Sequence, residues 1–96
     1  MLHFELQFHH NGYRYEAEAF VDPDKSPYLF FVILMNERLI KIYGREIFLK
    51  TDLEKVLPTK ASTMKLDKLR HDLLTGMKAT TKFQMLEHTF SHVRFN

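Results

Sequence analysis

The 96-residue chain has no cysteine and no tryptophan, and it has only three glycines and three prolines. Without cysteine there is no disulfide, no thiol nucleophile and no thiolate ligand for a metal. The longest apolar run, Tyr28 to Met35, has eight residues, whereas a membrane-spanning helix needs about 20. The N-terminal segment, Met1 to Glu5, lacks the basic and apolar parts of a secretory signal. We therefore expect a soluble, cytoplasmic protein without a membrane segment.

The residues that are present have an ordinary globular composition, with 45% hydrophobic and 27% charged types. A second core would need about 50 more residues, so we expect a single domain over 1–96. The sequence pattern divides it into a sheet over 1–50 and a mainly helical part over 51–96. The expected fold class is α+β: an antiparallel sheet of about five strands, a β-meander, followed by two or three short C-terminal helices.

The strongest local signal is Asn11-Gly12, which favours a two-residue type I′ hairpin turn. Apolar and polar residues alternate on both sides of it, as in strands with one buried face. Folding about this turn pairs His10 with Tyr13. The same register pairs the apolar residues with one another: Phe8 with Tyr15, Leu6 with Ala17, Phe4 with Ala19, and Leu2 with Val21. Turn chemistry and hydrophobic pattern therefore predict the same hairpin.

Three more strands are predicted after the proline-containing loop at 22–27. Residues 28–35 are apolar on both sides, as in a central strand covered on both faces. Turns at 36–37 and 44–45 would delimit strands over 39–43 and 46–49.

The sequence pattern of the C-terminal half predicts helices. Thr51-Asp52-Leu53-Glu54 matches a capping box, which predicts a short helix ending at Pro58. Ser62 or Thr63 would begin a second helix, which Gly76 would end or fray. Its apolar stripe is Leu66, Leu69, Leu73 and Met77. Residues 81–95 fit a helix with the stripe Phe83, Leu86, Phe90 and Val93, or a closing strand; we favour the helix.

The middle strands are expected to carry more apolar surface than the chain itself covers. With the turns above, one sheet face would hold Phe30, Val32, Leu34, Tyr43 and Phe48, together with Leu39. One helix stripe covers one face only, so the C-terminal segment or a second molecule must cover the other. Most soluble oligomers are homo-oligomers, and twofold dimers are the commonest. We expect these five residues to form a protein interface, in a homodimer or with another protein.

Two groups of side chains are weak candidates for a divalent metal. The hairpin register places Glu5 opposite Glu18 on the outer face, with His3 near them, although solvent screening alone makes such a pair tolerable. His88 and His92 have the i, i+4 spacing of helical zinc ligands, but no third ligand lies nearby in the sequence. We expect no metal and no other cofactor.

Positive charge is concentrated in the second half of the chain, which suggests an alternative function in nucleic-acid binding. The candidate residues are Lys60, Lys65, Lys68, Arg70, Lys78 and Lys82. Acidic residues lie among them, and there is no glycine-rich phosphate loop. The serines also lack the surroundings of a nucleophile elbow, so we do not expect an enzyme. The expected function is that of a small non-enzymatic domain acting by protein–protein interaction, including self-association.

Overall fold

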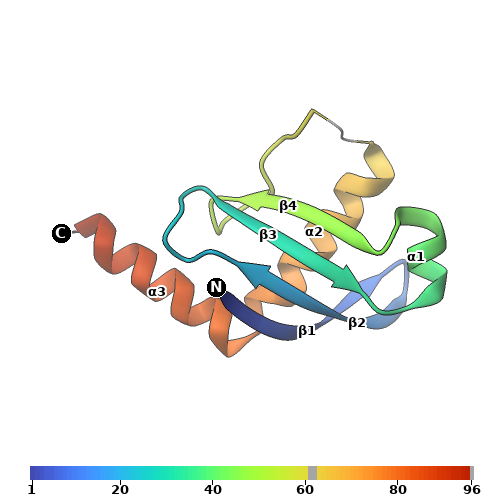
Figure 1. Ribbon diagram of the computed structural model, residues 1–96, viewed down its shortest axis with the longest axis horizontal. Coiled ribbons are helices and arrows are strands. Elements are labelled where there is room, and N and C mark those ends of the chain that lie inside the picture. The colour runs from blue at the N-terminus through green and yellow to red at the C-terminus, as the bar shows by residue number, and fades with distance from the viewer. Residues whose placement is uncertain (61–62, 96) are drawn as a thin grey trace.

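A four-stranded antiparallel sheet with one long helix behind it forms the body of the computed structural model (Figure 1), which describes residues 1–60 and 63–95 and the side chains through residue 88. The strands are β1 (Leu2–His10), β2 (Tyr13–Val21), β3 (Tyr28–Leu34) and β4 (Glu46–Thr51), side by side in chain order. The helices are α1 (Glu37–Tyr43), α2 (Met64–Lys78) and α3 (Thr81–Phe95). The α+β class and the meander are confirmed, with four strands rather than five.

The N-terminal hairpin has the predicted turn and the predicted register. Asn11 and Gly12 have φ angles of 50° and 86°, the positive values of a type I′ turn. His10 pairs with Tyr13, and the pairing continues without a slip to Leu2 opposite Val21. The residues that alternate inward are buried except at the strand starts, where Leu2 is half-buried and Tyr13 is exposed. The residues between them are exposed or half-buried.

The strand predicted over 39–43 is wrong, because this segment is helix α1. Asn36 caps the helix, its side-chain oxygen accepting a hydrogen bond from the Arg38 amide at 2.9 Å. Gly44 ends it in a left-handed conformation, with φ 86°, and donates its amide to the Ile40 carbonyl at 2.8 Å. With α1 in place of a strand, β3 pairs directly with β4.

The helix predicted from the Thr51 capping box is also wrong. Thr51 ends β4, and its hydroxyl oxygen accepts from the Leu53 amide at 2.9 Å while its O–H donates to the Lys55 carbonyl. Asp52 accepts from the amides of Lys55 and Glu54, which lower the pKa of its carboxyl. These side-chain bonds stabilise a turn, with Leu53 at φ 78°, instead of a helix.

Helix α2 covers the inner face of the sheet. Thr63 caps it, and Leu69, Leu73 and Met77 of the predicted stripe are fully buried, whereas Leu66 is half-buried. Gly76 does not end the helix as predicted. It lies inside α2, where its lack of a side chain lets the helix approach β1 closely.

Helix α3 has the predicted helical backbone and contributes Phe83 and Leu86 to the core. The Phe83 ring lies 5.8 Å from that of Phe30. The other two residues of the predicted stripe, Phe90 and Val93, have side chains outside the described part of the chain. In Figure 1, α2 lies behind the sheet and α3 runs beyond its end, so none of the described helices crosses the front face.

Gly76 provides a test of this packing. Alanine normally stabilises a helix interior by about 1 kcal/mol relative to glycine. A Cβ at residue 76 would lie 2.5 Å from the Gln7 carbonyl oxygen and 2.7 Å from the Phe8 Cβ. We expect Gly76→Ala to lower the free energy of unfolding by about 1–3 kcal/mol in urea titrations. Thr75→Ala, at an exposed neighbouring position of α2, is the control and should cost little. A stabilising Gly76→Ala would contradict the close approach.

Candidate functional site

The outer face of the sheet carries a row of aromatic side chains that crosses all four strands. His3 pairs with Phe20, Phe20 with Phe31, and Phe31 with Phe48. We call these four residues the aromatic row. Neighbouring rings are in contact, with centroids 4.3 Å apart between His3 and Phe20, 6.1 Å between Phe20 and Phe31, and 5.2 Å between Phe31 and Phe48.

The β3–β4 half of this face is apolar and accessible. Phe48 is 51% exposed and Leu29 is 53% exposed. Phe31 and Ile33, on the same face, are half-buried. A shallow cavity of about 510 Å³ lies beside the row and is lined by Phe20, Leu29, Phe31, Phe48 and the β2–β3 loop. Exposed aromatic clusters of this kind are typical of protein-binding surfaces.

The five predicted interface residues do not share a face, which corrects the sequence prediction. Phe30, Val32 and Leu34 are fully buried on the inner face. Tyr43 lies on α1 and is half-buried. Only Phe48 is exposed, and it lies on the opposite face of the sheet from Phe30, because it pairs with Phe31. The predicted surface is therefore replaced by the aromatic row and its apolar neighbours.

Most of the predicted nucleic-acid residues bind other parts of the chain. Lys68 donates to the Asn11 side chain, Lys78 to the Glu54 carbonyl and Lys82 to the His3 carbonyl, each at 2.7 Å. Arg70 is buried and donates to the Phe48 carbonyl at 2.8 Å. All five lysines are exposed, so Arg70 is the one residue of the six that the chain buries.

The weak metal candidates are not assembled into a site. Glu5 pairs with Glu18 as predicted, and the Nε2 atom of His3 lies 3.7 Å from the Glu18 carboxylate. His88 is exposed on α3, and the side chain of His92 lies outside the described residues. Among the side chains described, no three from His, Asp and Glu come together with metal-binding geometry.

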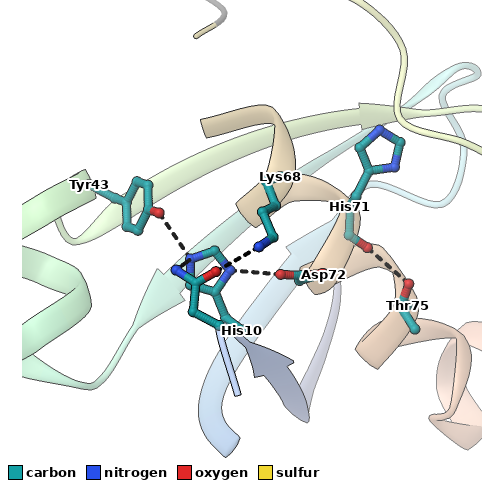
Figure 2. A network of polar contacts seen from close by, with 7 residues as sticks. His10, Tyr43, Lys68, His71, Asp72 and Thr75 are labelled. Atoms are coloured by element: carbon teal, nitrogen blue, oxygen red, sulfur yellow. Dashed lines mark hydrogen bonds and ion pairs between the residues drawn. The ribbon is translucent and has the colours of Figure 1, made fainter. Parts of the chain in front are cut away.

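A buried polar network joins the tip of the hairpin to α1 and α2, and sequence reasoning missed it. Figure 2 shows His10 between Tyr43 and Asp72. The Nδ1 atom of His10 lies 2.7 Å from the Asp72 carboxylate, and its Nε2 atom lies 2.9 Å from the Tyr43 hydroxyl. His10 itself is only 2% exposed.

The neighbours of His10 determine its tautomer. Lys68 donates to the Oδ1 atom of Asn11, so the Asn11 amide nitrogen points to Nε2 of His10, at 3.3 Å. An amide NH₂ is only a donor, so Nε2 acts as an acceptor and Nδ1–H donates to Asp72. The Tyr43 hydroxyl then donates to Nε2.

This network fixes the positions of its elements and occupies both ring nitrogens of His10. Both ring nitrogens of His10 have protein partners, so neither is available to a substrate. Burial, the Asp72 carboxylate and Tyr15 all raise the pKa of Tyr43, which keeps the phenol protonated at neutral pH. Tyr43 and Asp72 lie 33 and 62 positions after His10 in the sequence, and no local pattern indicates that the three residues meet.

Removing the carboxylate should weaken the network. In Asp72→Ala the Nδ1–H group of His10 loses its acceptor, and a buried unpaired donor costs about 1–3 kcal/mol. We expect the free energy of unfolding to fall by that amount in urea titrations. His71→Ala, at the exposed neighbouring position, should change it by less than about 0.5 kcal/mol. Equal effects of the two substitutions would contradict a structural role of the Asp72 contact.

The raised pKa of Tyr43 predicts the alkaline behaviour of the protein. Because the folded pKa lies above the ordinary value of 10.0, its contribution to stability is complete below pH 10.0 and is lost as the pH rises through the raised pKa. Asp72→Asn should lower the pKa of Tyr43 only in part, because burial is the largest cause of the shift. NMR titration of labelled tyrosine measures the pKa of Tyr43 in the unaltered chain and in Asp72→Asn. A Tyr43 pKa that Asp72→Asn leaves unchanged would contradict the Asp72 contribution.

Comparison with protein-family models, curated proteins and solved structures finds no match for this chain. None of the helices in the described part of the chain has the length and apolar character needed to cross a membrane. The function must therefore be argued from the geometry above. Of the two features, the aromatic row is the one open to a second molecule.

Proposed function

We propose that this chain is a non-enzymatic interaction domain that binds a second copy of itself through the outer face of the sheet. The observation that carries the proposal is the exposure of Phe48 and Leu29 beside the ring contacts of Phe31. Helix α2 already covers the inner face, whose residues are buried. The outer face carries contiguous exposed apolar side chains, and burial of apolar area drives most protein association.

The edges of the sheet favour contact through the face and not through strand addition. At β4, the Phe48 carbonyl accepts from Arg70, and the Lys50 carbonyl accepts from the Leu57 amide at 2.8 Å. At β1, the His3 carbonyl accepts from Lys82, and Gly76 of α2 lies against the Gln7 carbonyl. Carbonyls that are already bonded or covered pair less readily with an added strand.

A twofold arrangement is the simplest way to cover the same patch on two copies. In such a dimer each copy uses an identical surface, so Phe31 and Phe48 of one meet the same region of the other. Two sheets that pack face to face interlock their side chains at about 10 Å. Nucleic-acid binding is not favoured by any contact of the six basic residues, most of which bind the chain itself.

Placing a charge at the centre of this surface should separate the copies. Phe48→Glu removes the ring contact with Phe31, so the free energy of unfolding of a single copy should fall by about 1 kcal/mol while the chain stays folded. It should weaken self-association by about 2 kcal/mol or more, as expected for a central aromatic residue. Sedimentation velocity over a concentration series measures the amounts of the single copy and of the dimer.

Ile42→Glu is the matched control, since Ile42 is 59% exposed but lies on α1. It should associate as the unaltered chain does. If Phe48→Glu and the unaltered chain sediment alike, self-association through this face is wrong. A single copy at every concentration would also overturn it and leave the face to a different protein.

A further inference from the structure

The charges that flank the aromatic row differ in sign on its two sides. On one side, Glu5 pairs with Glu18, Glu18 with Ile33 and Ile33 with Glu46, so one rung of the sheet carries three carboxylates. On the other side, Leu29 pairs with Lys50. Lys25, beside the same cavity, lies 4.0 Å from Asp22. The outer face therefore carries three carboxylates on one side of the row, whereas Lys50 and the Asp22–Lys25 ion pair lie on the other side.

A twofold axis between two identical facing sheets can take different directions in the plane between them, and two directions keep the strands of the copies aligned. An axis parallel to the strands leaves each acidic rung facing the acidic rung of the second copy. An axis along the aromatic row reverses the strand direction, so each acidic rung faces the side that carries Leu29 and Lys50. Like charges that face each other across an interface disfavour the first orientation.

We propose that two copies pack outer face to outer face about an axis along the aromatic row, so that Glu46 of each meets Lys50 of the other. This inference rests on the proposed self-association and specifies its geometry. On β4, Glu46 and Lys50 lie at equal distances from Phe48, two residues to either side, and both are exposed. The axis passes over Phe48, so it exchanges their positions.

The apolar residues of β3 match in the same orientation. Ile33 and Leu29 lie two residues to either side of Phe31, so the axis places Ile33 of one copy over Leu29 of the other. Leu29 lines the shallow cavity beside the row, and Ile33 of the second copy would fill that space. The same axis places Glu18 of one copy over Asp22 of the other, where Lys25, 4.0 Å from Asp22, offsets the like charges. Two contacts between Glu46 and Lys50 and two between Ile33 and Leu29 then follow from one axis.

A charge swap tests this orientation. Glu46→Lys alone and Lys50→Glu alone each place like charges together at two symmetric positions, and each should raise the dissociation constant about tenfold at low salt. The double variant Glu46→Lys/Lys50→Glu restores opposite charges and should return to within about threefold of the unaltered chain. An equimolar mixture of the two single variants should form a mixed dimer more tightly than either forms its own. Sedimentation equilibrium measures the dissociation constants of the two single variants, the double variant and the mixture.

Lys65→Glu, at an exposed position in the first turn of α2, controls for the change in net charge and should have little effect. If the unaltered chain dimerises and Phe48→Glu separates it, but the double variant and the mixture associate no better than the single variants, this orientation is wrong while the proposed function stands. If no self-association is found in the unaltered chain, both are wrong.

Discussion

The close packing of α2 on β1 is the contact on which the rest of the structure depends. Gly76 lets the helix reach the Gln7 backbone, and the stripe from Leu69 to Met77 then fills the inner face. The helix packs against β1 at Gly76, and its Arg70 side chain reaches the Phe48 carbonyl of the other edge strand, β4. A single helix layer, however, cannot cover two faces of a sheet.

The exposed aromatic row follows from that constraint. Strand β3 is apolar on both sides, and its inner residues Phe30, Val32 and Leu34 are fully buried. Register places its outer residue Phe31 between Phe20 and Phe48, so the surplus apolar surface forms one continuous patch. The His10 network contributes differently. It holds α1 and α2 at the hairpin tip through the two ring nitrogens of His10.

Local signals predicted much of this fold. The Asn11-Gly12 turn and the alternation around it gave the hairpin register, and the double-sided apolar run gave β3. The strand prediction over 39–43 failed because Leu39, Ile40 and Tyr43 fit the apolar pattern of a strand as well as that of a short helix. The Asn36 and Gly44 caps decide for the helix. Counting that segment as a strand moved Phe48 to the wrong face. The His10–Asp72 contact spans 62 positions and has no local signature.

The most direct test of the central claim is an isotope-filtered NMR experiment on a mixture of labelled and unlabelled chains. It detects only contacts between copies, so it identifies the surface that binds. The account predicts contacts between copies from the rings of Phe31 and Phe48 and from the side chains of Leu29 and Ile33. Contacts between copies that arise from the helices, or a sample that shows none at concentrations where the chain remains folded, would contradict it.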